Sequence, residues 1–187
     1  MGVLVSAPRF VAPFTPITDS FDRADSTTTM GNTDTGQTWV PNAGTWGITS
    51  NTAYLQAGSG QNTTVVDSGV SDCTVGFTIS TYAANLGFCL RSQNDSNHLL
   101  VTFGGGIALE VYTKIANSFT VIASNSTTVT SGDAVSVVLS GTSIVVKKNG
   151  TTVLSTTSSS FQTETKHGLR NFGATAARFN DFSVTVP

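Results

Sequence analysis

Five residues in the central and C-terminal parts of the chain carry the kinds of side chain that hold a sugar. An aromatic ring can stack on a pyranose, and a guanidinium, an imidazole and a carboxylate can hydrogen-bond its hydroxyl groups. The candidates for such a glycan-binding site are Arg91, His98, Glu110, Tyr112 and Arg170. The alternative interpretation is that they are ordinary polar residues on a solvated sheet face.

Strand pairing is what would bring four of these side chains together. A hairpin that turns at 94–95 places Arg91 opposite His98. The next hairpin, which turns at a glycine triplet, places His98 opposite Tyr112 and Glu110 in the neighbouring row. Because side chains alternate along a strand, the four are expected on one face. This row requires Arg91 and His98 to point to the same side.

The residues of the opposite parity in these strands are apolar, which predicts that they fill a core. We also expect Trp39 and Trp46 to pack in the core or at a sheet edge, with a ligand platform as the alternative. Arg170 extends the polar face in this interpretation, across a longer connection whose pairing the sequence does not fix. The expected core residues of the three strands are Phe88, Leu90, Leu99, Val101, Phe103, Leu109 and Val111.

Nearly all of the chain after residue 18 reads as strand and turn. No stretch of ten residues keeps apolar side chains at helical spacing, and turn residues such as Asn149-Gly150 separate the runs. The first and last runs, 19–23 and 176–186, are expected to lie together and so to cover sheet edges. The sequence predicts an all-β protein with one antiparallel β-sandwich over 19–187. The other expected strands are 45–49, 52–56, 62–66, 72–79, 86–93, 97–103, 107–112, 118–123, 134–140, 143–148, 151–155 and 166–171.

Residues 1–18 differ from the rest of the chain. Three prolines interrupt a set of apolar residues, and prolines at this density favour an extended course. An apolar extended arm needs a surface to lie on, which is either a partner subunit or its own domain; both remain open, with docking onto a partner preferred. The arm residues expected to dock are Val3, Leu4, Phe10, Phe14 and Ile17.

Composition excludes several classes of partner. Only 11% of the 187 residues are charged and the net charge is -2, so no basic surface gathers phosphates and we expect no nucleic acid. No run approaches the roughly 20 apolar residues that span a bilayer, so we expect no membrane insertion. The start lacks a cationic segment followed by an unbroken apolar one, which predicts a protein made in a cytoplasm without a signal peptide.

The acidic residues do not form a catalytic pair. Glycosidases need two carboxylates about 5 Å apart for retaining chemistry, yet Glu110 stands alone in its strand and Glu164 lies in a loop rich in Ser and Thr. No Gly-x-Ser-x-Gly nucleophile turn occurs, although a Ser-His-Asp arrangement stays open. The glycine triplet at 104–106 joins two strands and opens no helix, which argues against a phosphate site. We therefore expect no enzymatic activity.

The two cysteines are expected to be free thiols. If 72–79 and 86–93 form a hairpin, Cys73 and Cys89 are offset by roughly 13 Å along a strand, beyond the limit of about 7 Å for a disulfide. We expect no metal and no cofactor. Calcium stays an alternative because four carboxylates gather near the start, but their spacing matches no contiguous calcium loop. They are Asp19, Asp22, Asp25 and Asp34.

The order of several motifs resembles the concanavalin A-like, laminin G-like jelly-roll superfamily over nearly all of 19–186. The motifs are Ser20-Phe21-Asp22-Arg23-Ala24-Asp25, Gly44-Thr45-Trp46-Gly47-Ile48, Leu86-Gly87-Phe88-Cys89-Leu90-Arg91 with Asn94-Asp95-Ser96-Asn97, Val146-Lys147-Lys148-Asn149-Gly150 and Ala177-Arg178-Phe179-Asn180-Asp181-Phe182. Three further stretches are similar to modules in tail-associated and other virion proteins of phages that infect actinobacteria. These are 25–28, 31–39 and 167–170.

This resemblance implies a non-enzymatic virion structural protein, either a minor tail protein or a capsid-decorating one. Its arm would attach it to other virion proteins, and its lectin-like sandwich would display a surface for host glycans. A homo-oligomer is compatible with this interpretation. The alternative is a free-standing carbohydrate-binding module or a degenerate glycan hydrolase. Similarity of fold does not itself fix function.

Overall fold

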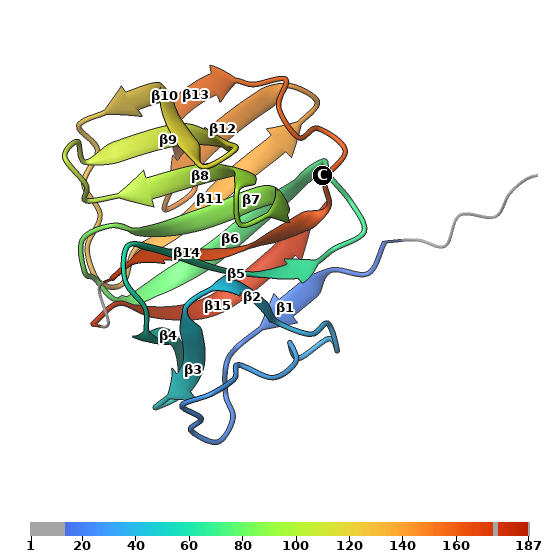
Figure 1. Ribbon diagram of the computed structural model, residues 1–187, viewed down its shortest axis with the longest axis vertical. Coiled ribbons are helices and arrows are strands. Elements are labelled where there is room, and N and C mark those ends of the chain that lie inside the picture. Colours follow the sequence, from blue (N-terminus) through green and yellow to red (C-terminus); the bar gives the residue numbers. More distant parts are fainter. Residues whose placement is uncertain (1–13, 174–175, 187) are drawn as a thin grey trace, which may run out of the picture.

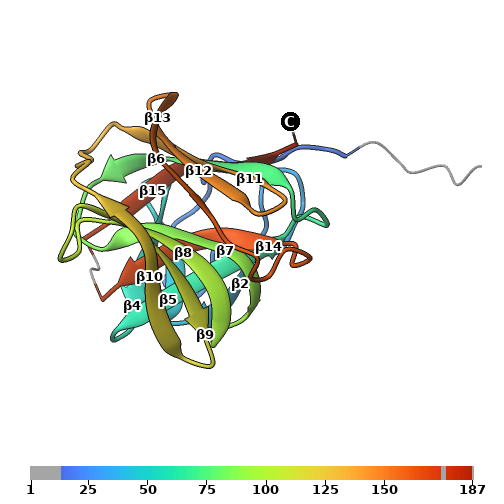
Figure 2. The ribbon, with the colours of Figure 1, turned by 90° about the horizontal axis from the view of Figure 1, so that it is seen from above.

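The computed structural model describes residues 14–173 and 176–186. All regular structure in these residues is β-strand, arranged as two antiparallel sheets packed face to face (Figures 1 and 2). Figure 2 shows β6, β11 and β12 in one layer above β7, β8 and β14 in the other. The described residues include no helix long and apolar enough to cross a membrane. The fold is an all-β antiparallel sandwich of the jelly-roll type, as the sequence predicts.

The first sheet has eight strands in the order β13-β12-β11-β6-β15-β4-β3, with β1 paired to β15. Their bounds are β1 Ile17–Asp19, β3 Thr45–Thr49, β4 Thr52–Ala57, β6 Cys73–Thr81, β11 Ala134–Ser140, β12 Ser143–Lys148, β13 Thr151–Thr157 and β15 Arg178–Thr185. The second sheet has seven strands in the order β10-β9-β8-β7-β14-β5-β2. Their bounds are β2 Val40–Ala43, β5 Gln61–Asp67, β7 Leu86–Asn94, β8 Asn97–Phe103, β9 Leu109–Ile115, β10 Ser118–Asn125 and β14 Lys166–Phe172.

One continuous hydrophobic core fills the space between the sheets. It contains all seven apolar residues that the alternation in β7, β8 and β9 assigned to it, so that prediction is confirmed. Trp39 and Trp46 are buried, also as expected. Trp39 Nε1–H donates to Asp19 Oδ2 at 2.7 Å, and Trp46 Nε1–H donates to the Ala43 carbonyl at 3.1 Å. Both rings thus satisfy their one polar group inside the core.

The two ends of the domain lie side by side, because β1 pairs with β15. The first strand is displaced from its predicted position, however. It spans Ile17–Asp19 and stops there, since the Asp19 carboxylate accepts the backbone N–H of Phe21 at 2.9 Å and Phe21 has a left-handed φ of 56°. The predicted strand over 19–23 is therefore wrong in its bounds.

The predicted boundary between an arm at 1–18 and a domain at 19–187 is also wrong, because it cuts through β1. Ile17 is fully buried opposite Val184, and Phe14 packs against the same core. These two residues belong to the sandwich, since burying their side chains here stabilises the domain itself. Val3, Leu4 and Phe10, the other residues of the expected docking arm, lie outside the described residues.

Asp19 is engaged by the protein's own donors. Besides Trp39 and Phe21, its carboxylate accepts Arg23 Nη2–H in a salt bridge. Asp34 lies 3.8 Å from the same guanidinium. Across the described ranges, no three His, Cys, Asp or Glu side chains gather closely enough to hold a metal ion.

The two cysteines are free thiols, as predicted, and both are buried. The hairpin used for that argument does not form, because β6 pairs with β11 and β15 while β7 pairs with β8 and β14. Cys73 and Cys89 therefore lie in different sheets. Cys73 points into the main core, and Cys89 belongs to a small hydrophobic cluster with Val65 and Leu100.

Candidate functional site

The face of the seven-stranded sheet that points away from the core, the outer face, carries the candidate site. Residues paired directly across successive strands form a row over this face: Val40, Val65, Gly168, Cys89, Leu100, Tyr112 and Val121. Tyr112 packs beside the buried cluster of Val65, Cys89 and Leu100. The Tyr112 ring thus stands beside a floor of aliphatic and small side chains.

The register of β8 with β9 differs from the predicted one by two residues. Tyr112 lies opposite Leu100 and not opposite His98, which pairs with Lys114. The turn between the strands is longer than expected, because the Gly104 N–H donates to the Ala108 carbonyl at 2.8 Å. A two-residue shift preserves the face of every side chain. His98, Glu110 and Tyr112 therefore still share the outer face.

Arg91 does not belong to this face, and the predicted Arg91–His98 row is wrong. A β-bulge interrupts the β7–β8 pairing after Leu90, and Arg91 sits in it with a left-handed φ of 44°. The bulge breaks the alternation on which the prediction depended. Arg91 is fully buried and donates to the Ser71 carbonyl at 3.1 Å, the Gly141 carbonyl at 2.8 Å and Asp72 Oδ1 at 2.8 Å. Its guanidinium joins the two sheets.

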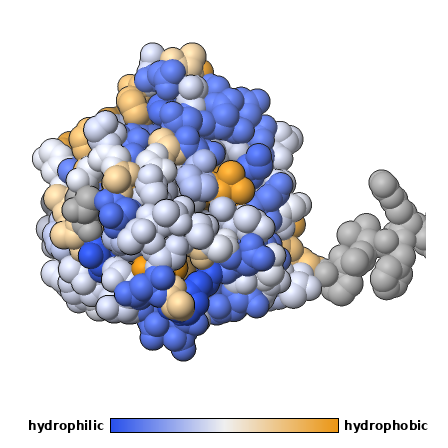
Figure 3. Space-filling view, turned by 60° about the horizontal axis from the view of Figure 1, so that its bottom comes forward, coloured by the Kyte–Doolittle hydropathy of each residue, from blue (hydrophilic) through white to orange (hydrophobic). Residues whose placement is uncertain are grey.

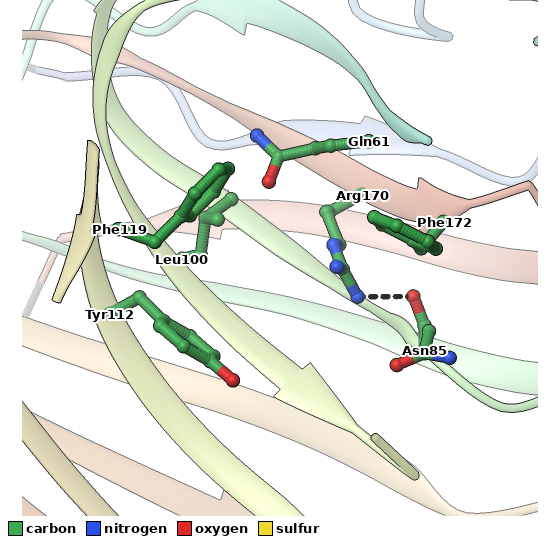
Figure 4. Close-up of a pocket in the computed structure, with 7 residues that line it drawn as sticks. All are labelled: Gln61, Asn85, Leu100, Tyr112, Phe119, Arg170 and Phe172. Carbon is green, nitrogen blue, oxygen red and sulfur yellow. Dashed lines mark hydrogen bonds between the residues drawn. The ribbon is translucent and has the colours of Figure 1, made fainter. Parts of the chain in front are cut away.

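A pocket of about 250 Å³ opens on the outer face (Figure 4). Three aromatic rings surround it, of which Phe119 and Phe172 are each about half exposed. Tyr112 meets Phe119 edge-on, with ring centroids 6.4 Å apart. The lining residues are Gln61, Asn85, Leu100, Tyr112, Phe119, Arg170 and Phe172. Figure 3 shows hydrophobic residues as small separate patches among polar residues on the face in view.

Arg170 is the charged group of the pocket and is 7% exposed. Its Nη1–H donates to the Asn85 carbonyl at 2.5 Å, and its guanidinium carbon lies 5.4 Å from the centre of the Phe172 ring. Burial lowers the pKa of Arg170 to about 10, while the nearby Tyr112 and Glu110 act in the opposite direction. The guanidinium therefore stays charged at neutral pH. The prediction that Arg170 shares the face of Tyr112 is confirmed.

Glu110 and Tyr112 form a hydrogen-bonded pair at the edge of the pocket. The Tyr112 hydroxyl donates to Glu110 Oε2 at 2.6 Å. Burial, together with the bond to Glu110 and its charge, raises the pKa of Tyr112 to about 12. The phenol is therefore neutral at physiological pH, and the bond fixes the orientation of its ring beside the opening.

His98 is fully buried and does not line the pocket. Its Nδ1–H donates to the Asn94 carbonyl at 3.0 Å, which leaves Nε2 to accept Gln61 Nε2–H at 2.8 Å. Burial lowers the pKa of His98, so the ring is neutral. His98 acts by positioning Gln61, a pocket residue that the sequence did not single out. No local signal marks Gln61, because it reaches the pocket only through the pairing of β5 with β14.

A second pocket of about 320 Å³ lies on the same sheet toward β2. Its floor is Val40 and Val65, and its walls are polar. Asn42 Nδ2–H donates to Ser92 Oγ at 3.1 Å beside it. The wall residues are Gln37, Thr38, Asn42, Asp67 and Lys166.

The described residues show no catalytic pair at either pocket. The residues directly opposite Glu110 are Thr102 and Ser124, so register supplies it with no second carboxylate. Cys73 Sγ lies 3.5 Å from His167 Nε2, but both residues are fully buried, and burial raises the pKa of Cys73 to about 12. A thiol with these properties is a core residue and not a nucleophile.

Comparison with known proteins extends the fold assignment. No protein-family model matches the chain, and no curated protein matches its sequence. Among solved structures, the chain is similar to the carbohydrate-binding module CBM66 from Bacillus subtilis, with 19% identity, a TM-score of 0.69, and coverage of 79% of this chain and 94% of that one. It is also similar to the carbohydrate recognition domain of Emp46p in its metal-free form, with 11% identity, a TM-score of 0.56, and coverage of 79% and 86%.

A third solved structure, a Bacillus subtilis protein of unknown function with a galectin-like fold, matches with 11% identity and a TM-score of 0.56 over 79% of this chain and 88% of that one. At these identities the similarity concerns the fold alone. The chain thus shares its architecture with galectin-like and concanavalin-like carbohydrate-binding jelly-roll domains.

Proposed function

We propose that this protein is a non-catalytic carbohydrate-binding domain and that the pocket around Arg170 is its sugar site. The observation that carries the proposal is that two half-exposed rings, Phe119 and Phe172, line one pocket together with the buried guanidinium of Arg170. Apolar sugar faces pack on rings, while hydroxyl groups take charged or neutral donors. The carbohydrate-binding domains of similar fold support this assignment.

The absence of catalysis is part of the proposal. Glu110 faces Thr102 and Ser124 in the sheet and accepts the Tyr112 hydroxyl, so it is placed to orient a ring. Hydrolysis of a glycoside needs a second carboxylate at a defined distance on the other side of the bond. Expected behaviour is therefore binding without turnover of the glycan.

We further propose that the domain is displayed on a phage particle, as a minor tail or capsid-decorating protein made in the host cytoplasm. This rests on the resemblance of 25–28, 31–39 and 167–170 to modules of virion proteins. Because Phe14 and Ile17 pack in the domain's own core, attachment to other virion proteins is assigned to Val3, Leu4 and Phe10. Many displayed copies would compensate for weak binding at each site.

Mass spectrometry of purified particles tests this part of the proposal. If the domain is displayed on the particle, we expect to find the chain there in stoichiometric amount. Deletion of residues 1–13 should remove it from the particles. Absence from the particles would favour a free-standing carbohydrate-binding module.

Glycan binding is tested with a matched pair of exposed residues. We expect Phe172→Ala to weaken binding on a glycan array and in calorimetry by about fivefold, the equivalent of about 1 kcal/mol for a lost ring contact. Ile115→Ala is the control, since Ile115 is 50% exposed but does not line the pocket. Equal affinities for the two variants would show that the site lies elsewhere, and no binding of any glycan by the unmodified protein would reject the proposed function.

A further inference from the structure

Two buried polar atoms of the pocket have no hydrogen-bond partner among the described residues: Arg170 Nε and Gln61 Oε1. Both side chains extend into the pocket between Leu100 and Phe172 (Figure 4). Buried polar atoms are nearly always paired, because leaving one unpaired costs the free energy of its lost hydration. A bound molecule that supplies the missing bonds recovers that cost.

The orientation of the Gln61 amide follows from its neighbour. His98 donates its Nδ1–H to the Asn94 carbonyl, so its Nε2 carries a lone pair and requires a donor. Gln61 supplies that donor with Nε2–H at 2.8 Å. The amide oxygen is therefore turned away from His98, and it is an acceptor without a donor in the described part of the chain.

A ligand that satisfies both atoms must therefore supply one acceptor and one donor. Arg170 Nε–H needs an acceptor, and Gln61 Oε1 needs a donor. A hydroxyl group both donates and accepts, so neighbouring hydroxyls of a sugar satisfy both atoms. A carboxylate only accepts, so one that takes the place of a hydroxyl beside Gln61 leaves the amide oxygen unpaired.

Charge balance around the pocket points the same way. The positive charge of Arg170 is opposed by Glu110, with which it interacts favourably. The other nearby cation, Lys114, donates to the Asp95 carbonyl at 2.6 Å and lies 3.7 Å from the Asp95 carboxylate. Each cation has its own anion, so no excess positive charge is left to attract an acidic ligand.

Resting on the proposed function, we infer that the pocket selects neutral sugars with adjacent hydroxyl groups over the corresponding uronic acids. Arg170 in this site is a hydrogen-bond donor to a hydroxyl and not an anchor for a carboxylate. Glu110 disfavours an acidic ligand through its charge, while its bond to Tyr112 keeps the ring in place.

The test compares glucose with glucuronate and galactose with galacturonate, titrated by calorimetry or NMR against the full chain at low ionic strength. We expect the preferred neutral sugar to bind about tenfold more tightly than its uronic acid. The uronic acid either places its carboxylate at Gln61 and leaves that oxygen unpaired, or binds through its hydroxyls and brings a negative charge into a pocket that Glu110 borders. The matched variant is Glu110→Gln, whose amide oxygen can still accept the Tyr112 hydroxyl while the charge is removed. In this variant the affinity for the neutral sugar should exceed that for its uronic acid by a smaller factor.

The outcomes separate the inference from the proposed function. Tighter binding of a uronic acid overturns the inference and leaves the proposed sugar site standing. An unchanged ratio in Glu110→Gln refutes the role given to that carboxylate. If neither series binds, at concentrations where NMR would detect millimolar affinity, the inference fails; the proposed function fails only if the glycan array shows no binding either.

Discussion

Acidification should destabilise this protein through His167, a fully buried residue of β14. Its Nδ1 accepts the Arg91 backbone N–H at 3.2 Å, and its Nε2–H donates to the Val70 carbonyl at 3.1 Å. Burial lowers the pKa of His167 from 6.5 to about 4, against an opposing effect of the Val70 carbonyl. The imidazole is therefore neutral in the folded protein at pH 5, where it is charged in the unfolded chain.

The sign and size of the effect follow from these two pKa values. Between pH 6.5 and 4 the unfolded chain binds more protons than the folded one, so the free energy of unfolding decreases as the pH falls. At pH 5 the unfolded imidazole is almost fully protonated and the folded one is about one-tenth protonated, which makes the loss between pH 7 and pH 5 about 2 kcal/mol.

Urea unfolding followed by tryptophan fluorescence at pH 7 and pH 5 measures this loss. His167→Gln keeps one donor and one acceptor but cannot titrate, so its stability should fall by about 2 kcal/mol less than that of the unmodified protein over the same interval. Asp19, whose pKa is raised by burial, and His98, whose pKa is lowered by burial, also titrate differently on folding. Both groups titrate in the variant and in the unmodified protein, so their contributions cancel when the two losses of stability are compared.

Equal losses in the two proteins would refute the reasoning. They would mean that His167 is not the group whose protonation is suppressed by burial. A larger loss in the variant would show that the substitution had opened the core to water.

Two further predictions concern stability. In Gly168→Ala the new Cβ would lie 2.0 Å from the Thr64 carbonyl oxygen, so we expect the free energy of unfolding to fall by about 3 kcal/mol or the variant not to fold. The control is Gly106→Ala, whose new Cβ would meet no atom within 4 Å and which should melt like the unmodified protein. Similar melting curves for the two variants would contradict the close approach at Gly168. Trp39→Phe removes the Nε1–H donor at 2.7 Å from the buried Asp19, which should lower the free energy of urea unfolding by about 1–3 kcal/mol, and an unchanged value would show that another donor replaces it.

Local patterns were enough to predict most of the strands, though not β2 or the bounds of β1, and the core faces of β7, β8 and β9. All seven residues that alternation assigned to the core lie there, because successive side chains of a strand point to opposite faces whatever the strand pairs with. The same rule places Glu110 and Tyr112 together. It does not depend on register, since a shift of two residues leaves every face unchanged.

Arg91 shows where local reasoning stops. Nothing in Leu90-Arg91-Ser92 marks a bulge, yet one bulge turns this side chain from the predicted outer face toward Ser71 and Asp72. The bulge is stabilised by carbonyls from the other sheet. Its position is therefore decided by the packing of two sheets and not by the strand in which it occurs.

The amino-acid sequence was sufficient to predict an all-β sandwich, its two free thiols, and which side of each central strand is apolar. The tertiary structure alone decided that Gln61, Phe172 and Phe119 surround Arg170, because these residues come from β5, β14 and β10, and pairing between distant strands brings them together. Alternation is a property of one strand's backbone. A pocket depends on long-range registers, bulges and turns, whose energies are settled only when the whole sandwich is packed.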